Sequence, residues 1–468
     1  MTRYVAAFLL AIAVAGLVPA RAQSLIVPLS GKRVRSIQAE SLFHTLFRDF
    51  FPEDDGTTYV ETGDIPAMWL RDSAAQTIPY IRFQLSYPIL RNRFTGVIER
   101  DARSILTDPY ANAFQADYHV WERKWEIDSL AWPVLLARVY LDTTGDRTIY
   151  TPALHSALRR IVGTYACEEH HKSCKEYYYP YRVYTDDSYN DDTGLIWSAF
   201  RPSDDPVQYR FNIPQNMIAA IALRDIWVLA LDGYRDRLLA NEALGVERRI
   251  AGGIILYGRY YDERRGGWLW AFETDGNGRY NLMDDANIPN LLTLPYLDWC
   301  SAYDPTYLNT RQFSLSNDNP WYFSGRYGMG LGSPHTGNEY VWPLGIIGRA
   351  LTSTSSAEVL DSVTTLAETD SEQGMIHESF YSDGYWRFTR QEFGWANALY
   401  AELLFRSVAG LPATSFVNGG GTIIPQERPS ATPVLLPQVM QLHNASVLFE
   451  TLGRLLYAGR EAAINQMP

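Results

Sequence analysis

Apolar residues recur at intervals of three and four positions over most of the chain. Between residues 36 and 50 this spacing forms one stripe, made of Ile37, Leu42, Phe43, Leu46, Phe47 and Phe50. Residues 89–106 repeat the pattern, which predicts amphipathic helices. The same criterion predicts helices at 126–141, 150–165, 214–232, 236–261, 338–352, 355–369, 391–408 and 435–464.

Long polar loops separate these helices. They are rich in Tyr, Asp, Asn, Pro and Gly and cover 52–73, 108–124, 168–212, 262–290, 302–337 and 371–390. Loops of about 15 residues or more are uncommon in compact domains unless they build a site. The alternation therefore favours a helical toroid whose loops meet at one rim. Regular strands for a doubly wound sheet are not evident, although short hairpins are expected around residues 266–280.

The first 22 residues have the pattern of a secretory signal. Arg3 supplies the positive start, Val5–Val18 the apolar core, and Ala20–Ala22 the small-residue cleavage site. This core is shorter than the roughly 20 residues that span a bilayer. We expect a secreted or periplasmic protein that begins near Gln23, with a retained N-terminal anchor as the alternative. Residues 23–468 show no clear boundary and are expected to form one domain.

Composition narrows the classes of function. The 468 residues include 41 basic and 53 acidic ones, a net charge of −12. This acidic balance argues against a nucleic-acid groove, which needs a basic stripe. Aromatic residues reach 13% of the chain. That share fits either a well-packed core or a pocket that stacks on sugar rings.

Two of the three cysteines lie close together. Cys167 and Cys174 enclose His170 and His171, so a zinc site is one interpretation. In so short a loop, two adjacent histidines are poorly placed to coordinate one zinc ion tetrahedrally together with both thiolates. An oxidising compartment favours a local disulfide instead. Cys300 is then expected to be a buried thiol.

Four loop segments concentrate groups that can do chemistry: residues 62–73 (TGDIPAMWLRDS), 200–205 (FRPSDD), 281–289 (NLMDDANIP) and 374–380 (GMIHESF). Two separated carboxylates among aromatic side chains are the minimum equipment of a glycosidase. The same residues can serve only as helix caps and ion pairs. The usual zinc, calcium, phosphate-loop and serine-hydrolase motifs are absent from the sequence. No metal or cofactor is expected, and a calcium site built from acidic loops is the alternative.

Taken together, these segments resemble glycoside hydrolase family 125, the exo-α-1,6-mannosidases. The matching stretches follow the family's order over about residues 35–410: Thr62–Gln76, Asp108–Phe114, Lys124–Pro133, Gly194–Asp205, Ile213–Met217, Met283–Tyr296, Gly332–Thr336 and Gly374–Phe380. The resemblance implies an all-α (α/α)6 toroid as the single catalytic domain at 23–468, with long loops forming a pocket at one rim. Residues 410–468, with their glycine-rich start and final helix, extend beyond the resemblance. It further implies metal-independent, anomer-inverting hydrolysis of terminal α-1,6-linked mannose, without a cofactor.

The resemblance also assigns catalytic roles. It places the general acid at Asp205 or Asp204 and the general base at Glu378, with Glu392 as a rival for the base. An inverting enzyme leaves room for a water between these carboxyl groups, which predicts a separation of about 6.5–9.5 Å. The acid is expected to have a pKa raised by burial or by a like-charged neighbour, for which the second Asp of the pair is a candidate.

Further residues are expected to bind the sugar. Asp64, Arg71 and Asp72 would bind mannose hydroxyls, and Trp69 would pack against the ring. Additional candidates for contact with the substrate are Asn216, Asp285, Asn287 and His335. The expected partner is a mannose-containing oligosaccharide, with no nucleic acid and no membrane span after signal cleavage, and the protein is expected to be a monomer.

Two alternative functions remain open at this stage. The first is another inverting α-glycosidase on the same toroid, acting on a glucoside or a rhamnoside. The second is a catalytically inactive glycan-binding protein. Hydrolysis of mannobiose separates the first from the expected mannosidase, and substitution of the catalytic carboxylates tests the second.

Overall fold

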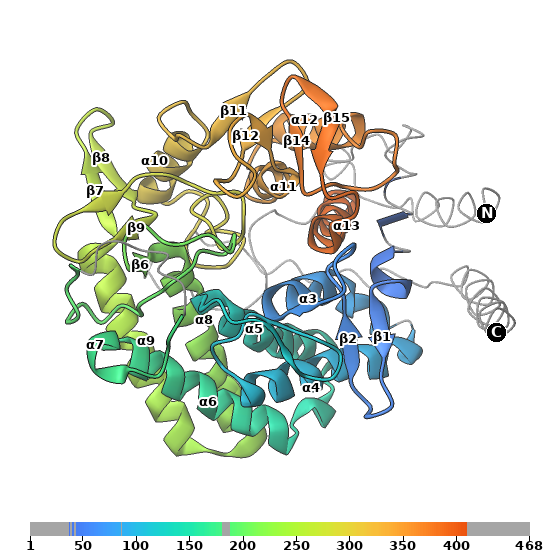
Figure 1. Ribbon diagram of the computed structural model, residues 1–468, viewed down its shortest axis with the longest axis vertical. Helices are drawn as coiled ribbons and strands as arrows, with labels where there is room; N and C mark the ends of the chain where they lie inside the picture. The colour runs from blue at the N-terminus through green and yellow to red at the C-terminus, as the bar shows by residue number, and fades with distance from the viewer. Residues whose placement is uncertain (1–36, 38–39, 42–43, 86, 180–187, 410–468) are drawn as a thin grey trace, which may run out of the picture.

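The chain winds once around a ring of helices and returns to its starting point (Figure 1). This computed structural model describes residues 37, 40–41, 44–85, 87–179 and 188–409. The described residues between 37 and 47 are helical. The later α-helices are α3 (Leu70–Thr77), α4 (Arg91–Thr107), α5 (Ile127–Thr144), α6 (Pro152–Glu168), α7 (His171–Cys174), α8 (Ile213–Leu229), α9 (Arg237–Tyr257), α10 (Pro305–Ser314), α11 (Pro343–Leu351), α12 (Ser356–Glu368) and α13 (Gly394–Ala409).

Two layers of helix make up the ring. In the inner layer α3 packs on α5, α5 on α8, α11 on α13, and α13 back on α3. Every residue of α3 and α11 and most residues of α5 and α8 are buried, as expected for inner helices. Helices α4, α6, α9 and α12 bury one face only and lie outside them. The fold is therefore the expected all-α (α/α)6 toroid.

One inner position is irregular. Between α8 and α11, residues 291–298 form successive turns rather than a helix. They are nevertheless buried in the core, and Tyr296 donates a hydrogen bond of 2.8 Å to Glu402 of α13. Tyr307 of α10 donates another, also of 2.8 Å, to the carbonyl of Leu292. The second bond satisfies a backbone carbonyl that a helix would have paired internally.

The helices of the ring begin in two ways. Among the described helices, five start at a side chain that accepts a hydrogen bond from the amide three residues later: Thr151, Asn212, Asp236, Asp304 and Ser355. Such caps satisfy free amides at the helix start. The inner helices α3, α5 and α11 instead follow Trp69, Glu126 and Trp342, whose side chains make no cap. The side chains of Trp69, Glu126 and Trp342 are therefore not used to cap these helices.

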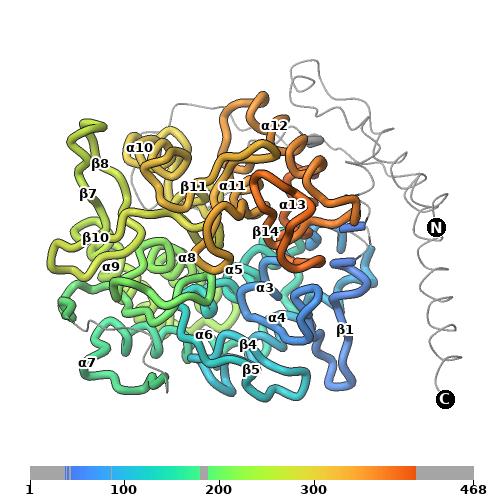
Figure 2. Tube along the Cα trace, turned by 45° about the horizontal axis from the view of Figure 1, so that its top comes forward, coloured from blue at the N-terminus to red at the C-terminus, as the bar shows by residue number. Residues whose placement is uncertain are grey.

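The loops contribute only short strands. The described strands are β1 (Phe50–Pro52), β2 (Thr58–Val60), β3 (Met68–Trp69), β4 (Ala113–Phe114), β5 (Val120–Glu122), β6 (Phe211–Asn212), β7 (Arg259–Asp262), β8 (Gly267–Trp270), β9 (Glu273–Thr274), β10 (Tyr280–Asn281), β11 (Tyr322–Ser324), β12 (Met329–Leu331), β13 (Tyr340–Val341), β14 (Ser379–Tyr381) and β15 (Gly384–Thr389). They form antiparallel sheets of two or three strands. The predicted hairpins near residues 266–280 are confirmed as β7–β8 and β9–β10. The tube view shows the β7–β8 hairpin at the periphery of the ring (Figure 2).

Several predicted boundaries were wrong. The stripe at 36–50 ends in strand β1 rather than in helix, and the helix predicted at 338–352 begins only at Pro343 because β13 precedes it. Helix α10 lies inside a segment predicted to be a loop, and α3 begins inside another, since both helices are short and carry many polar residues. The signal segment and the helix predicted at 435–464 lie outside the described residues. None of the described helices has the length and apolar character needed to cross a bilayer.

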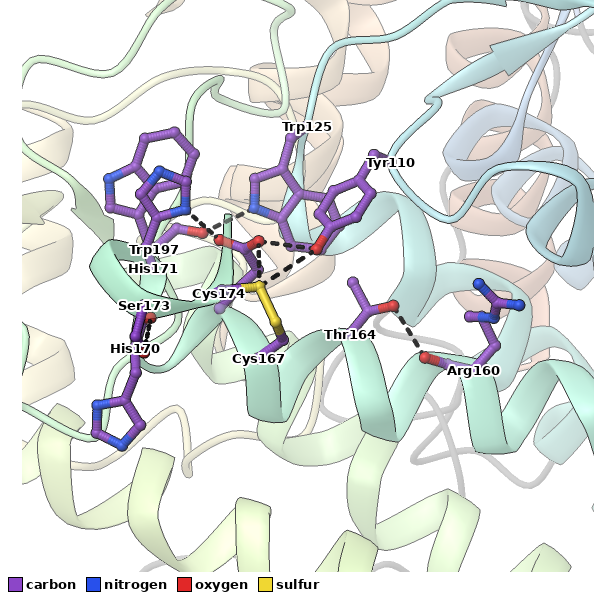
Figure 3. Close-up of a disulfide and its surroundings, with 11 residues drawn as sticks. Tyr110, Trp125, Arg160, Thr164, Cys167, His170, His171, Ser173, Cys174 and Trp197 are labelled. Carbon is purple, nitrogen blue, oxygen red and sulfur yellow. Dashed lines mark hydrogen bonds and ion pairs between the residues drawn. A yellow bond between two sulfur atoms is a disulfide. The ribbon is translucent and has the colours of Figure 1, made fainter. Parts of the chain in front are cut away.

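The cysteine prediction is confirmed. Cys167 and Cys174 form a disulfide at the end of α6 (Figure 3), and Cys300 is a buried thiol. The zinc interpretation fails because the two sulfurs bond each other. His171 stacks on Trp197 at 3.6 Å between ring centroids. The end of α6 is thereby attached to the segment that leads into residues 200–205.

Candidate active site

Loops from around the ring enclose one cavity of about 320 Å³. This volume is at the lower end of the range for ligand pockets, about 300–1,000 Å³. Its lining consists of Thr62, Ile65, Trp69, Arg71, Asp72, Pro202, Ser203, Asp204, Asn287, His335, Trp342, Glu378, Arg390, Phe393 and Trp395. The starts of inner helices α3, α11 and α13 lie here, so the toroid presents its loops at the cavity, as expected.

Aromatic rings form part of the wall. Trp342 and Phe393 meet edge to face with centroids 6.2 Å apart, and Phe393 meets Trp395 in the same way at 6.2 Å. Trp69 is largely buried and its indole nitrogen has no hydrogen-bond partner among the described residues. Rings of this kind provide apolar faces while leaving donors for a polar ligand. The wall therefore suits a ligand with both apolar and hydroxyl-bearing faces.

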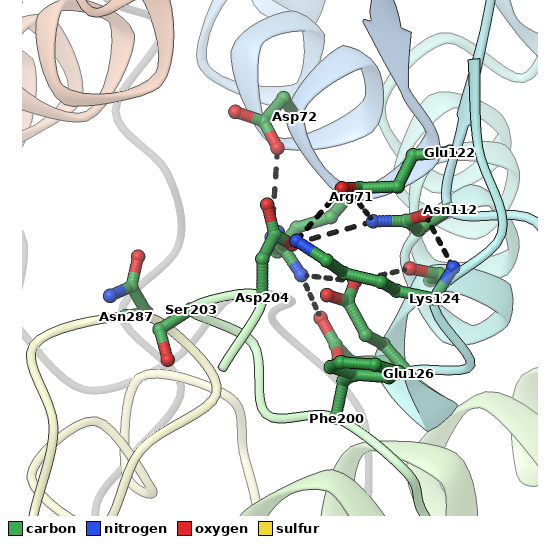
Figure 4. Close-up of polar contacts among 12 residues, drawn as sticks. Arg71, Asp72, Asn112, Glu122, Lys124, Glu126, Phe200, Ser203, Asp204 and Asn287 are labelled. Atoms are coloured by element: carbon green, nitrogen blue, oxygen red, sulfur yellow. Dashed lines mark hydrogen bonds and ion pairs between the residues drawn. The ribbon is translucent and has the colours of Figure 1, made fainter. Parts of the chain in front are cut away.

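Arg71 is surrounded by carboxylates (Figure 4). Its Nη1 contacts Glu126 at 2.9 Å and Asp128 at 3.3 Å, and its Nη2 contacts Asp204 at 3.2 Å. Asp72 lies 3.6 Å from its Nε. Burial lowers the pKa of Arg71, but these four carboxylates raise it well above its ordinary value. The guanidinium is a permanent cation that holds the acidic groups of three segments together.

Asp204 faces the cavity and is held as an anion. Its φ of +65° is left-handed, a conformation that Asp tolerates better than most residues. Burial raises the pKa of Asp204, but a hydrogen bond with Glu126 and the charges of Arg71 and Lys124 bring it down to about 2. The expected raised pKa of the acid was therefore wrong for Asp204. The nearby cations and the shared hydrogen bond account for the difference.

Glu126 shows the opposite behaviour. Its side chain is fully buried, and burial together with the negative charge of Asp204 raises its pKa well above the ordinary value. Burial likewise raises the pKa of Asp128 to about 6. The like-charged neighbour of Asp204 is thus Glu126 and not, as suggested from the sequence, Asp205. Neither Glu126 nor Asp128 was identified from the sequence, although both lie within the matching stretch at 124–133.

Asp205 is not part of the cavity lining. It accepts a hydrogen bond of 3.1 Å from Ser203 and pairs with His335 at 3.5 Å. The bond to Asp205 raises the pKa of His335 to about 9, so this histidine is a cation at neutral pH. His335 lines the cavity and carries that charge into it.

A β-hairpin positions Glu378 beside Arg390. Ser379 of β14 pairs with Thr389 of β15, so the residues just outside this pair lie next to each other. The Nη1 of Arg390 is 3.8 Å from the Glu378 carboxylate. Burial raises the pKa of Glu378, while the cations Arg390 and His335 oppose that shift. Arg390 was not identified from the sequence, because nothing near it in the chain marks it as a cavity residue.

A close backbone contact brings the first motif to this hairpin. Gly63 bridges Phe393 with φ of +83°, and a Cβ there would lie 2.5 Å from the carbonyl oxygen of Glu392. Only glycine fits such an approach. The contact allows Arg390 to bond Asp64 at 2.7 Å, across 326 residues of sequence. Asp64 thus lies against Arg390 and outside the cavity lining.

Asp285 orients a cavity residue rather than lining the cavity. It accepts hydrogen bonds from the backbone and side-chain nitrogens of Asn287 at 2.9 and 3.0 Å, and one of 3.0 Å from Ser333. Asn287 itself lines the cavity. Asp285 therefore fixes Asn287 and the loop that carries His335.

Two other candidates are engaged elsewhere. Asn216 is fully buried, and its amide bonds only backbone groups of Ile196 and Asn212. The Glu392 carboxylate contacts His44 at 2.6 Å and is absent from the cavity lining. Of the residues singled out from the sequence, the structure places in the lining Trp69, Arg71, Asp72, Asp204, Asn287, His335 and Glu378. Among the described residues, no group of three His, Cys, Asp or Glu side chains is arranged to hold a metal ion.

Comparisons with known proteins identify the family of this chain. A family model described as metal-independent alpha-mannosidase (GH125) matches residues 32–119 and 116–405. The meiotically up-regulated gene 157 protein of Schizosaccharomyces pombe is 35% identical over 389 residues, which are 74% of this chain and 76% of that protein.

Two solved glycosidase structures are similar to this chain in fold. A metal-independent α-mannosidase of Streptococcus pneumoniae, in a non-productive complex with α-1,6-mannobiose, superposes with a TM-score of 0.77. It is 34% identical, over 81% of this chain and 95% of that one. A bacterial glucoamylase complexed with acarbose, at 13% identity and a TM-score of 0.56 over 82% of this chain and 56% of that one, shares the fold.

Proposed function

The chain belongs to the metal-independent α-mannosidases of family GH125, and from that premise we propose that it is an exo-acting, anomer-inverting α-1,6-mannosidase. Membership makes it a glycoside hydrolase. One observation carries the finer proposal: Asp204 and Glu378 reach the same cavity from loops 174 positions apart (378 − 204). Hydrolysis of a glycosidic bond requires such a pair.

In this proposal Asp204 is the general acid and Glu378 the general base. Asp204 gives a proton to the glycosidic oxygen as the bond from that oxygen to C1 breaks. Glu378 takes a proton from the water whose oxygen forms the new bond to C1 from the opposite face. The products are the free leaving sugar and β-mannose. Asp204 is preferred to Asp205 because only Asp204 lines the cavity.

The remaining lining supports a terminal mannose as substrate. A cavity of about 320 Å³ suits one terminal sugar rather than the middle of a chain. Asp72, Asn287 and Arg390 offer hydrogen-bonding groups, and Trp69 and Trp342 offer apolar faces. The proposed α-1,6 linkage is supported by the α-1,6-mannobiose bound in the non-productive complex of the Streptococcus pneumoniae relative.

We further propose that the protein acts outside the cytoplasm, in the periplasm or the medium. The support is the signal-like segment at residues 1–22 and the Cys167–Cys174 disulfide, since disulfides persist in oxidising compartments. Detection of mature protein beginning near Gln23 in a periplasmic or culture fraction tests this part.

A linkage panel tests the substrate. We expect release of mannose from α-1,6-mannobiose but little from the α-1,2 and α-1,3 isomers or from an α-glucoside. With a mannotriose labelled at its reducing end, the first labelled product should be the disaccharide, because an exo-enzyme removes the terminal unit. Faster hydrolysis of the glucoside, or labelled mannose as the first product, would refute the assignment.

A further inference from the structure

The general acid of the proposed reaction has no proton of its own in the free protein. The pKa of Asp204 is about 2, because a hydrogen bond from Glu126 and the charges of Arg71 and Lys124 outweigh the effect of burial. At neutral pH this carboxylate is an anion. A general acid, however, must carry a proton when the glycosidic bond breaks. The proton therefore has to come from a neighbour.

Glu126 is the neighbour in contact with Asp204. One guanidinium holds both carboxyl groups, since Arg71 bonds Glu126 through Nη1 at 2.9 Å and Asp204 through Nη2 at 3.2 Å. A hydrogen bond between the two carboxyl groups is one cause of their opposite shifts: it raises the pKa of Glu126 and lowers the pKa of Asp204. Two carboxylates accept but do not donate, so this bond requires one proton between them.

The unused oxygen of Glu126 identifies where that proton resides. Oε2 accepts from Arg71 and from Ser129 at 3.0 Å. Oε1 is fully buried and receives no hydrogen bond from any donor group within the described part of the chain. A buried carboxylate oxygen without a donor is costly. A hydrogen on Oε1 that is shared with Asp204 removes this cost.

The surrounding charges favour retention of a proton. Carboxyl groups outnumber cations around Glu126, and burial raises the pKa of Asp128, its neighbour on α5, to about 6. The charged and titratable groups that surround the Glu126–Asp204 pair are Arg71 and Asp72 of α3, Glu122 and Lys124 of the β5 segment, Asp128 of α5, and His335 across the cavity. A buried cluster with this excess of negative charge lowers its free energy by binding a proton.

We propose that Glu126 is a positioning residue that stores the proton Asp204 delivers to the leaving sugar, an inference that rests on the proposed role of Asp204 as general acid. The proton passes from Glu126 to Asp204 when substrate excludes water, and from Asp204 to the glycosidic oxygen as its bond to C1 breaks. Glu126 is left as a carboxylate paired with Arg71. Glu378 gains a proton from water in the same turnover, and exchange with solvent returns one to Glu126.

The substitution Glu126→Gln tests this inference. The amide can still donate a hydrogen bond to Asp204 but cannot release a proton. We expect kcat on α-1,6-mannobiose to fall by about 10²-fold or more, the usual contribution of a general acid. An aryl α-mannoside with a nitrophenolate leaving group needs no protonation, so its kcat should stay within a few-fold of wild type. Glu126→Asp, which keeps an ionisable group, should restore part of the mannobiose activity.

Glu273→Gln is the matched control. Glu273 is equally buried and bonds Arg201 at 2.6 Å in the same loop, but it does not touch Asp204. Its substitution should affect both substrates alike. Undiminished mannobiose hydrolysis by Glu126→Gln, or equal losses on both substrates, would overturn the inference.

A spectroscopic measurement makes the result independent of activity. The infrared spectrum of the substrate-free protein at pH 7 should contain a protonated carboxyl band that disappears in Glu126→Gln and persists in Glu273→Gln. No difference between wild type and Glu126→Gln would overturn proton storage. If wild type shows this band but does not hydrolyse mannobiose, the proposed function fails while storage of the proton stands.

Discussion

The two walls of the cavity hold their catalytic carboxyl groups in different charge environments. The Asp204 wall consists of Arg71, Asp72, Glu126, Asp128 and Asp204. There one arginine contacts all four carboxyl groups at 2.9 to 3.6 Å. Lys124 adds a second positive charge nearby. Negative charge is in excess, so this wall keeps a proton.

The Glu378 wall, made of His335, Glu378 and Arg390 with Asp64 bonded to Arg390, is closer to balance. Arg390 contacts Asp64 at 2.7 Å and Glu378 at 3.8 Å. His335 adds a cation of its own. Two positive groups thus face three carboxylates, because His335 also pairs with Asp205. Both cations oppose the rise that burial causes in the pKa of Glu378. In this account, the ratio of carboxylates to cations around each group, rather than the type of residue, makes Asp204 the general acid and Glu378 the general base.

The largest predicted effect distinguishes the two carboxylates by leaving group. Asp204→Asn and Glu378→Gln should each lower kcat/KM for α-1,6-mannobiose by about 10³-fold or more, at the upper part of the range for general acid–base catalysis. With a nitrophenyl α-mannoside, Asp204→Asn should recover most of its rate and Glu378→Gln should not, because only the acid step becomes dispensable. Recovery of the rate by Glu378→Gln but not by Asp204→Asn would instead make Glu378 the general acid and Asp204 the general base.

Stability should respond to the two arginines unequally. Arg71→Met leaves buried carboxylates without their cation and is expected to lower the free energy of unfolding by about 3–5 kcal/mol. Arg390→Met should cost about 1 kcal/mol or less, since its side chain is 18% exposed and its ion pairs are partly solvated. Urea unfolding at neutral pH measures both. Equal losses would contradict the difference in charge balance.

A smaller effect concerns His335. Its pKa in the folded protein is about 9, raised from 6.5 by the bond to Asp205. The stabilisation from its charge is therefore complete below pH 6.5 and is lost as the pH rises towards 9. Relative to His335→Asn, wild type should lose stability across this window and not below it. Denaturation at pH values below, within and above the window measures the difference, and parallel curves would contradict it.

The same substitution should alter the activity profile. The His335 charge lowers the pKa of Glu378, so its removal should move the acidic limb of kcat/KM to higher pH. Because His335 is partly exposed, the shift should be a fraction of a pH unit. An unchanged acidic limb would indicate that His335 does not act on the base.

The smallest expected effect is that of chelation. Both walls carry out their roles with protein cations, and the family is described as metal-independent. Exhaustive dialysis against a chelator should leave kcat/KM on mannobiose unchanged. Loss of activity that added calcium restores would show that the acidic wall needs an ion in addition to Arg71.

Much of the fold could be predicted from the sequence because long helices have a strong apolar period. Predictions at 214–232 and 236–261 correspond to α8 and α9. The start of helix α3 was misplaced, because residues 70–73 are mostly polar and were assigned to a loop, whereas all eight residues of α3 are buried. Residues 291–298 show the converse, an apolar segment that forms buried turns.

The site could be predicted in part. Asp204, Glu378 and Arg71 were found because their motifs gather several polar groups in a few residues. Glu126 and Arg390 were not, because their roles arise from contacts made only in the folded chain, such as the one between Arg390 and Asp64 across 326 positions. Local sequence could not decide between Asp204 and Asp205 either. Asp204 has a left-handed backbone conformation and lines the cavity. Asp205 is not in the lining and pairs with His335.

The most direct test of the account is proton NMR during hydrolysis of α-1,6-mannobiose by the wild-type enzyme. It reports substrate and anomeric outcome together. With Asp204 as acid and Glu378 activating water on the opposite face, the first mannose to appear should be the β-anomer, before mutarotation produces the α-anomer. Initial appearance of α-mannose, or no hydrolysis, would contradict the account.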